Sequence, residues 1–321
     1  MTAWLHTAMV LPEQVSPHRQ NLVTTVLVTT VLAGSGRQEQ PQLAGAPDRR
    51  GAILGLELGE NHRNQVTSAH RVRPYGRAGS LVVVRLHANG SQEVGIMSSQ
   101  VAVVIGAGAL GRATAAILAD SGLTVVAVDR TQDALRELPG SIRSEVADTT
   151  NPATVTPLVD RLAREIGPPA VLVNTIGAFR QGDALSTTPE TLQRMIDVNL
   201  GPALWMTQAV APHMTQLGSG AIVHVAARPA IEASGGMAAY SVSKAALVHL
   251  TRILDVELRP HGIRVNAVAP QLLDTATNRA AFPGEVMAHA VAPEAIAAVI
   301  AFLVSDAAAP VSGAILPAYG A

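Results

Sequence analysis

Apolar and polar positions follow an orderly pattern only in the second part of the chain, from about residue 98 onward. There, short runs of apolar and often β-branched residues alternate with longer segments in which apolar residues recur every three or four positions. Continuous apolar runs are typical of strands buried on both faces of a parallel sheet, and the longer segments are typical of the helices that cover those faces. The pattern predicts strands at residues 101–105, 124–129, 142–146, 169–174, 221–226 and 263–269, and "SGAILP" near the C-terminus can add one at an edge.

Helices are expected between these strands, with two long ones over residues 189–216 and 237–258 and another over residues 293–306. Parallel strands need crossover connections, and these place helices on both faces of the sheet. The sequence therefore predicts an α/β protein with a doubly wound Rossmann fold, in which a parallel sheet of about seven strands lies between two layers of helices.

Residues 1–97 lack this order. They carry nine arginines against six acidic residues, whereas residues 98–321 carry fourteen basic and eighteen acidic residues. Only residues 22–32 and 81–86 look like strands. We expect a poorly structured N-terminal extension over residues 1–97 and a single domain over residues 98–321. Since "MSSQVAVVIGAG" looks like a natural protein start, Met97 is a candidate for the true initiator.

The composition argues against several classes of function. A net charge of −1 gives no support to a nucleic-acid or membrane partner, and no run of about 18 apolar residues predicts a membrane span. The chain has no cysteine, which rules out disulfides and fits a reducing cytoplasm. None of the ten histidines belongs to a His-Glu-x-x-His motif, so no metal site is predicted. His224 is expected to be a strand residue with satisfied hydrogen bonds.

A glycine-rich turn after the first predicted strand of the second part gives the first indication of function. Gly106, Gly108 and Gly111 stand between this strand and a predicted helix. Glycines at this spacing allow a tight turn, the close approach of a pyrophosphate, and close packing of the helix on the strand. Asp129, at the end of the second strand, can accept hydrogen bonds from an adenosine ribose and repel a 2′-phosphate, which favours NAD over NADP. The adjacent Arg130 either favours NADP or is a solvated surface residue.

Tyr240 and Lys244 form the candidate catalytic pair. Residues four apart on a helix share a face, so the two side chains point the same way. We expect the Lys244 ammonium to lower the pKa of the Tyr240 phenol toward the working range. The phenol could then supply a proton while a reduced nicotinamide gives hydride to a carbonyl or imine carbon. Lys244 is the only lysine among 23 basic residues. The alternative is an ordinary amphipathic helix with a buried tyrosine.

Together with the other motifs given below, the glycine turn and the Tyr240–Lys244 pair make residues 98–321 resemble the short-chain dehydrogenase/reductase family over essentially their whole length. The similarity is carried by the glycine turn and by "EVADTT", "LVNTIGA", "DVNLG", "YSVSK" and "VNAVAP". The resemblance implies one NAD(P)-binding domain and catalytic roles for Tyr240, Lys244 and Asn199, the last anchoring a water that leads to the lysine. Besides the three glycines and Asp129, it implies coenzyme contacts at Asp148, Asn174, Gly177, Tyr240, Lys244 and Pro270.

The chain departs from the family's pattern at several positions. Ile105 replaces a threonine before a glycine turn that is one residue shorter, Thr175 and Ile176 replace an Asn-Ala pair, and Gln271 replaces a glycine. The largest departure is Ala227, thirteen residues before the tyrosine, where the family has a serine whose hydroxyl holds the substrate carbonyl. Ser234, Ser241 and Ser243 are candidates to replace that hydroxyl.

Dihydropteridine reductase, a branch of the family that also lacks the serine, is similar in "GAGALG", "GGMAAYSVSKAALVHL" and "LDTATNR". Phe179 falls roughly where that branch has an aromatic residue lining the pterin site. We therefore expect an NAD(P)H-dependent oxidoreductase that transfers hydride to a small carbonyl, imine or quinonoid, pterin-like substrate. Tyr240 would be the proton donor, with Ala227 and Phe179 beside the substrate.

The alternative function is a non-catalytic NAD(P)-binding sensor or scaffold protein that has lost the serine. Retention of the tyrosine, the lysine and Asn199 together favours the enzyme. The resemblance also implies a homodimer or homotetramer, because family members usually pair through the helices that correspond to residues 190–217 and 239–258.

Overall fold

The computed structural model describes residues 24–28, 80–86, 92–98 and 100–320, and the chain divides into two compact units, Met1–Ser98 and Ser99–Ala321. In the first unit, β1 (Thr24–Val28), β2 (Ser80–Leu86) and β3 (Gln92–Ser98) pair as an antiparallel sheet. β1 and β2 lie at the two strand-like stretches of the sequence, whereas β3 was not expected. The remaining prediction for residues 1–97 falls mostly outside the described residues and stays a prediction, as does a start at Met97.

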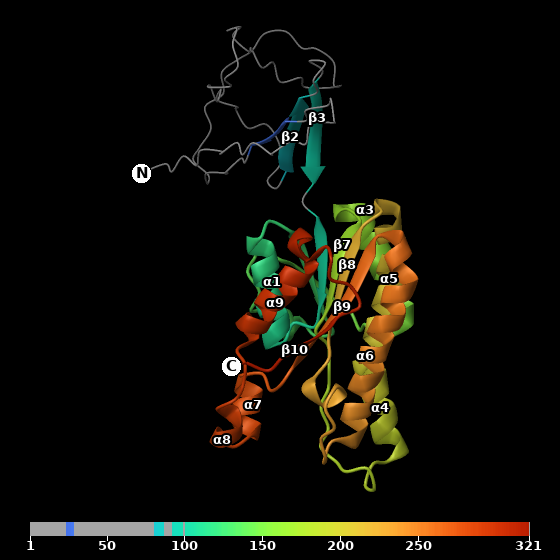
Figure 1. The fold of residues 1–321 in the computed structure, drawn as a ribbon, viewed down its shortest axis with the longest axis vertical. Coiled ribbons are helices and arrows are strands. Elements are labelled where there is room, and N and C mark those ends of the chain that lie inside the picture. The colour runs from blue at the N-terminus through green and yellow to red at the C-terminus, as the bar shows by residue number, and fades with distance from the viewer. Residues whose placement is uncertain (1–23, 29–79, 87–91, 99, 321) are drawn as a thin grey trace, which may run out of the picture. The chain divides into compact units, whose positions relative to one another are not determined.

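A parallel sheet of seven strands forms the centre of the second unit and confirms the predicted fold class (Figure 1). Every neighbouring pair of its strands is parallel. Across the sheet the order is β10 (Ile315–Ala318), β9 (Ile263–Pro270), β8 (Gly220–Val225), β7 (Pro169–Asn174), β4 (Val101–Ile105), β5 (Thr124–Asp129) and β6 (Arg143–Val146).

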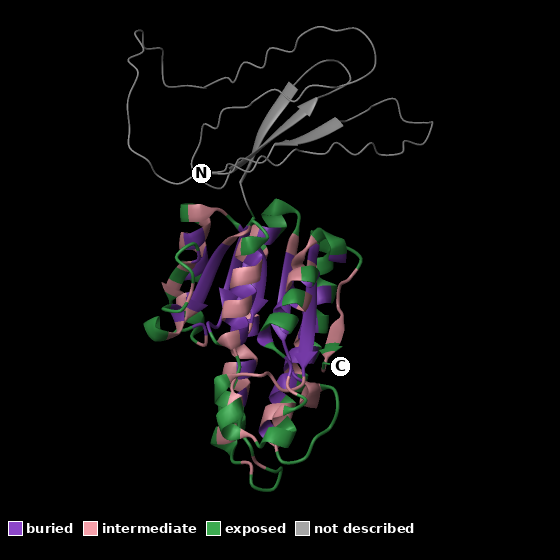
Figure 2. Ribbon diagram, turned by 90° about the vertical axis from the view of Figure 1, so that its left-hand side faces the viewer, coloured by how far each residue is buried: buried purple, intermediate pink, exposed green. Residues whose placement is uncertain are grey.

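Helices cover both faces of this sheet because alternate strand residues point to opposite sides. Val104 on β4 packs in a cluster with α1 and α9, whereas its neighbour Val103 packs with α3 and α5. Figure 1 shows α1 and α9 on one side of the strands and α5 and α6 on the other, and Figure 2 shows the buried strands behind helices with exposed outer surfaces.

The helices are α1 (Ala109–Asp120), α2 (Gln132–Leu135), α3 (Pro152–Ile166), α4 (Pro189–Asn199), α5 (Gly201–Leu217), α6 (Ala238–Leu258), α7 (Ala276–Ala281), α8 (Gly284–Met287) and α9 (Pro293–Val304), with short 3₁₀ turns η1 (Arg228–Ala230), η2 (Arg259–His261) and η3 (Asp306–Ala308).

The long helix expected over residues 189–216 is in fact two helices, α4 and α5, separated at Leu200. Pro202 stands in the first turn of α5, where its missing N–H costs nothing, but it cannot extend the hydrogen-bond ladder of a preceding helix. The break leaves Asn199 as the last residue of α4, where its side chain is buried.

The strand order reverses at β4, which pairs with β5 on one side and β7 on the other. In open α/β sheets, ligands bind outside the carboxyl ends of the strands at such a reversal. The predicted site residues gather at these ends: Gly106, Gly108 and Gly111 follow β4, Asp129 ends β5, Asp148 follows β6, Asn174 ends β7, Ala227 follows β8, and Pro270 ends β9.

Candidate active site

The three glycines of the turn after β4 have different surroundings. Gly106 adopts a φ of +89°, and its N–H donates to the carbonyl of Val128 at 2.8 Å, which ties the turn to β5. A Cβ added at Gly111 would lie 1.7 Å from the carbonyl oxygen of Gly106, so only glycine lets α1 approach the strand end this closely. A Cβ added at Gly108 would meet nothing within 4 Å, and no side chain caps the N-terminus of α1 there. Open space and free N–H groups at a helix N-terminus fit a pyrophosphate.

Two acidic residues lie at the ends of the neighbouring strands. Asp129 accepts a hydrogen bond at Oδ2 from the N–H of Ala107 (2.8 Å) and at Oδ1 from the N–H of Thr131 (3.1 Å), so it braces the turn. It remains partly exposed, and its carboxylate has lone pairs left for ribose hydroxyls. Asp148 is exposed, and hydrogen bonds from the hydroxyl (2.6 Å) and N–H (2.9 Å) of Thr150 lower the pKa of its carboxyl.

The segment after β7 closes the other side of the glycine turn. The Thr175 hydroxyl lies 2.9 Å from the carbonyl oxygens of both Ile105 and Gly106, to which it donates. Asn174 is buried and accepts the N–H of Ile176 at Oδ1 (3.0 Å). Thr175, which stood out in the sequence only as a departure from the family's pattern, therefore links the two loops at the strand reversal. The sequence signal that could have revealed this role is the presence of a polar residue directly after a buried strand.

Lys244 and Asn199 meet at Gly177. The Lys244 side chain is buried, and its Nζ donates to the carbonyl of Val225 at 2.8 Å. A Cβ added at Gly177 would lie 3.0 Å from this Nζ and 3.2 Å from Oδ1 of Asn199. Burial lowers the pKa of Lys244 to about 8. The side chains of Lys244 from α6 and Asn199 from α4 thus both lie beside Gly177 of the loop after β7, as expected for residues that the sequence assigned to one site.

Asn199 fixes the loop that carries Gly177. Its Oδ1 accepts the N–H of Ala178 (2.8 Å), and its Nδ2 donates to the Ala178 carbonyl (3.0 Å) and to Oγ of Ser243 (2.9 Å). The Ser243 hydroxyl donates to the carbonyl of Tyr240 at 2.7 Å. The amide therefore ties the loop to α6 at the level of the tyrosine. Ser243 is engaged in this network, which leaves its hydroxyl poorly placed to replace the missing serine.

Tyr240 lies one helical turn before Lys244 on α6, and its ring meets that of Phe179 edge-on, with centroids 5.1 Å apart. Burial raises the pKa of Tyr240 to about 12. The expectation that Lys244 lowers this pKa is wrong for this arrangement, because burial dominates and the ammonium is bonded to the Val225 carbonyl. Tyr240 is thus a neutral phenol at neutral pH, the protonation state that a proton donor needs.

Ala227 is buried after the end of β8, directly before η1, which packs against α6. Its neighbour Arg228 donates to Oε1 of Gln271 (3.1 Å) and forms an ion pair with Glu232 (2.7 Å). The Arg228 guanidinium also lies 4.9 Å from the ring centroid of Tyr319. Arg228 therefore connects two positions at which the chain departs from the family's pattern, because it directly follows Ala227 and donates to Gln271. Sequence reasoning missed this connection.

His224 lies on β8 directly before Val225, whose carbonyl binds the lysine. It is fully buried, and neither ring nitrogen has a hydrogen-bond partner among the described residues, contrary to the expectation of a satisfied strand histidine. Burial, with a smaller contribution from the charge of Lys244, lowers the pKa of His224 to about 3. The imidazole is therefore neutral at neutral pH.

This histidine makes folding stability depend on pH. Between pH 6.5 and about 3, the unfolded chain binds a proton at residue 224 that the folded chain excludes, so the free energy of unfolding falls as pH falls. We expect His224→Leu to flatten this slope by up to about 1.4 kcal/mol per pH unit below pH 6.5. Urea unfolding at several pH values measures it. The same change at the exposed His249 is the control, and equal slopes in wild type and His224→Leu would contradict the assignment.

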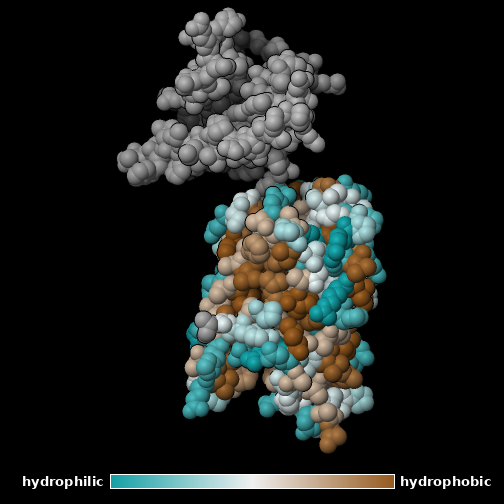
Figure 3. Space-filling view, viewed as in Figure 1, coloured by the Kyte–Doolittle hydropathy of each residue, from teal (hydrophilic) through white to brown (hydrophobic). Residues whose placement is uncertain are grey.

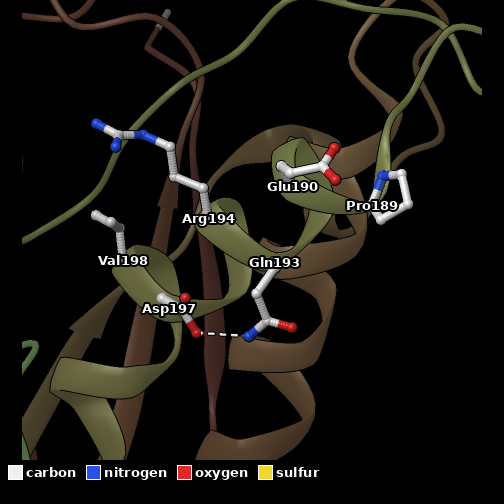
Figure 4. Close-up of a pocket in the computed structure, with 6 residues that line it drawn as sticks. All are labelled: Pro189, Glu190, Gln193, Arg194, Asp197 and Val198. Carbon is white, nitrogen blue, oxygen red and sulfur yellow. Dashed lines mark hydrogen bonds between the residues drawn. The ribbon is translucent and has the colours of Figure 1, made fainter.

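The hollow drawn in Figure 4 holds none of the predicted site residues. Its lining comes from α4 alone, where Gln193 donates to Oδ1 of Asp197 at 2.7 Å. The lining residues are Pro189, Glu190, Gln193, Arg194, Asp197 and Val198. An exposed face of one helix is a surface rather than a catalytic cleft, and we assign it no part in the chemistry.

Comparison with known proteins agrees with this geometry. Residues 106–320 match the profile of a family described as enoyl-(acyl carrier protein) reductase. Galactitol 2-dehydrogenase from Rhizobium johnstonii is 35% identical over 235 residues, which cover 67% of this chain and 91% of that protein. A crystal structure of a putative short-chain dehydrogenase/reductase from Burkholderia xenovorans is 30% identical, with a TM-score of 0.64, and the match covers 69% of this chain and 95% of that one. The chain belongs to the short-chain dehydrogenase/reductase family.

As a short-chain dehydrogenase/reductase, the protein is an oxidoreductase that depends on NAD or NADP. NAD⁺-bound xylitol dehydrogenase, another solved relative, is 27% identical with a TM-score of 0.65, and the match covers 69% of this chain and 98% of that one. Within the described part of the chain, every helix is too short or too polar to span a membrane, and no three His, Asp or Glu side chains converge as metal ligands would. A cytoplasmic location stays a prediction.

Proposed function

We propose that this short-chain dehydrogenase/reductase reduces a small carbonyl, imine or quinonoid compound with hydride from NADH or NADPH, and that Tyr240 donates the proton. The observation that supports this most directly is the meeting of Gly177, Lys244 and Asn199 one helical turn from the tyrosine. A bound reduced nicotinamide supplies the hydride. The protein has to supply the proton and the orientation, and these residues are of the kinds that do so.

The three polar residues have different tasks in this proposal. Tyr240 keeps its proton until the acceptor needs it, because burial holds its pKa at about 12. Lys244 carries a positive charge below pH about 8, and its ammonium suits the hydroxyls of a nicotinamide ribose. Asn199 is a positioning residue, since it holds the Gly177 loop against α6 through Ala178 and Ser243.

We propose NAD rather than NADP as the preferred coenzyme. The partly exposed carboxylate of Asp129 stands at the end of β5, where it would bind ribose hydroxyls and repel a 2′-phosphate, and Arg130 is a solvated residue in this proposal. The NAD⁺-bound xylitol dehydrogenase neighbour supports the same choice. The pyrophosphate would lie on the turn at Gly106, Gly108 and Gly111. The adenine would lie near Asp148 and the nicotinamide near Asn174, Gly177 and Pro270.

Ala227 supports an acceptor that needs little help from the protein. Loss of one hydrogen-bond donor to a developing oxyanion commonly costs a factor of about 10²–10³ in rate where the reaction depends on it. A quinonoid compound depends on it less, because its reduced product is aromatic or otherwise well stabilised. We therefore propose a quinonoid, pterin-like acceptor as in the dihydropteridine reductase branch. The name of the relative galactitol 2-dehydrogenase supports a carbonyl–alcohol pair as the second class to test.

The variant Ala227→Ser tests the part of this proposal that concerns the missing hydroxyl. If the native acceptor needs no serine, restoring one changes kcat by less than about tenfold. Steady-state kinetics with the best acceptor measure the effect. A rise of several orders of magnitude would show instead that the site lacks a group it requires. Ala233→Ser, a change of the same kind in the exposed loop after η1, is the control.

The proposed function is tested by following the absorbance of NADH and of NADPH with the full-length protein and a panel of acceptors. The panel contains quinonoid dihydropterin, aldehydes, ketones and cyclic imines. We expect consumption of coenzyme with at least one class, faster with NADH than with NADPH. Binding of both coenzymes without consumption across the panel would favour the sensor or scaffold alternative.

We also propose a homodimer or homotetramer that pairs through α4, α5 and α6. Val242, Ile253 and Val256 are 41% to 72% exposed, and their spacing places them along one side of α6. Figure 3 shows hydrophobic patches on the side of the molecule where α5 and α6 lie in Figure 1, and Leu192 of α4 is also exposed. Light scattering after size exclusion would show a mass above that of one chain. A monomer at working concentration would contradict the proposal.

A further inference from the structure

Aromatic side chains are scarce in this chain, and three of them gather at the candidate active site. The sequence contains three phenylalanines and three tyrosines. Phe179 follows β7, Tyr240 lies on α6, and Phe282 directly follows α7. The ring centroid of Phe179 is 5.1 Å from that of Tyr240 and 6.4 Å from that of Phe282. Phe179 therefore contacts the candidate proton donor directly, and Phe282 joins this group through Phe179 from a segment about a hundred residues further along the chain.

Backbone hydrogen bonds hold the segment that carries Phe282. The segment between β9 and α9 is closed at its base, where the N–H of Asp274 donates to the Val291 carbonyl (2.8 Å) and the N–H of Val291 donates to the Leu272 carbonyl (2.7 Å). Within the segment, the N–H of Phe282 donates to the carbonyl of Asn278 at 2.9 Å. These bonds hold the backbone at residue 282 relative to the end of β9, and the ring of Phe282 lies beside that of Phe179.

The exposure of these rings indicates a ligand surface rather than a core. Phe179 is 48% exposed although it touches two other rings, and Phe282 is partly exposed. An apolar ring left open to water at the edge of a catalytic pair gains free energy when a ligand covers it. Aromatic faces and edges favour a second flat ring over a saturated chain of similar size. Stacked and edge-to-face ring pairs contribute binding free energy beyond that of the area they bury.

We propose that Phe179 and Phe282 form two walls of the substrate site and select acceptors whose reacting carbonyl or imine is part of, or attached to, a flat ring. This inference rests on the proposed function, because it places the reacting group within reach of the Tyr240 hydroxyl. The ring of the acceptor packs on the exposed surface of Phe179 and meets Phe282 at its edge. Phe282 is then a specificity-determining residue contributed by the segment after β9.

Binding of two ketones to the full-length protein saturated with NAD⁺ tests this proposal without turnover, because the oxidised coenzyme carries no transferable hydride. Acetophenone and 2-octanone have the same number of carbon atoms and differ in the flat ring. In titrations followed by ligand-observed NMR, we expect acetophenone to bind at least about tenfold more tightly. Phe179→Leu and Phe282→Leu should each weaken acetophenone binding about three- to tenfold and leave 2-octanone within about twofold.

Phe302→Leu is the matched control, because Phe302 is 46% exposed on α9 and belongs to neither wall. This variant is expected to bind both ketones as the wild type does. Equal or undetectable binding of the two ketones by the wild type would overturn the proposal. An unchanged preference for acetophenone in both wall variants would overturn it as well.

A further variant separates this inference from the proposed function. Tyr240→Phe keeps the aromatic ring that Phe179 contacts and removes the hydroxyl. If both proposals hold, this variant retains the preference for acetophenone and loses turnover. Retained preference with unchanged turnover would count against the tyrosine mechanism alone, whereas lost discrimination in the wild type would count against the aromatic walls alone.

Discussion

Replacing Tyr240 by phenylalanine is expected to reduce NAD(P)H-dependent turnover by a factor of about 10²–10⁴, which is the usual contribution of a positioned proton donor. The substitution removes only the hydroxyl group, and the ring can still contact Phe179, whose ring centroid lies 5.1 Å away. The fold should therefore be kept, and coenzyme binding should lose at most the one contact made by this hydroxyl. Steady-state kinetics measure the loss, and thermal unfolding together with a coenzyme titration show that the rest of the protein is intact.

The matched control is Tyr319→Phe, the same chemical change at the other tyrosine that the structure describes. Tyr319 lies over the Arg228 guanidinium and outside the group formed by Gly177, Lys244 and Asn199. Loss of the Tyr319 hydroxyl should change kcat only slightly. If Tyr240→Phe consumed coenzyme as fast as the wild type, the tyrosine would not be the proton donor, however well the site is formed.

The second large effect is expected at Gly111. A methyl group there would lie 1.7 Å from the Gly106 carbonyl oxygen, which belongs to backbone held by a hydrogen bond to Val128. Either α1 or the turn has to move. We expect Gly111→Ala to destabilise the protein by more than the common range of about 0.5–3 kcal/mol for single substitutions. Urea or thermal unfolding measures this loss, and failure to obtain folded protein is its extreme form.

Gly108→Ala is the informative partner of that variant, because the same methyl group meets nothing within 4 Å and φ is −68°. Its stability should stay within about 1 kcal/mol of the wild type. The methyl group would instead occupy space that the pyrophosphate needs, so the affinity for NADH should fall at least about tenfold, or ~1.4 kcal/mol. Unchanged affinity would show that the dinucleotide does not bind on this turn.

Much of the fold could be predicted because strands and helices are encoded locally. β4, β5 and β7 occupy the ranges expected from their apolar runs, because a strand buried on both faces must be continuously apolar. The division between α4 and α5 also had a local signal, the Gly201-Pro202 pair. The glycine turn and the Tyr240–Lys244 spacing could be found for the same reason, since each lies within one short segment.

The remaining features of the site depend on contacts between loops that are far apart in the sequence. Thr175 bonding to Gly106, Arg228 bonding to Gln271, and Phe282 meeting Phe179 all join segments that follow different strands. No local pattern encodes such pairs. Each of these contacts could be found only once the sheet order had placed the strand ends side by side.

The pKa of the tyrosine shows a further limit of sequence reasoning. Spacing alone suggested that Lys244 would lower it, yet burial raises it to about 12 while the ammonium bonds to the Val225 carbonyl. Desolvation and the direction of a hydrogen bond both require coordinates, and here they reverse the expected sign. The reversed sign still agrees with the proposed chemistry, because a donor in the direction of reduction has to hold its proton at neutral pH.

The most direct test of this account is a crystal structure of the protein with NAD⁺. We predict a pyrophosphate on the N–H groups at the start of α1 and a nicotinamide ring beside Gly177, with the Tyr240 hydroxyl and the Lys244 ammonium directed at its ribose and reactive face. A dinucleotide bound elsewhere, or one whose nicotinamide lies out of reach of the Tyr240 hydroxyl, would contradict the account.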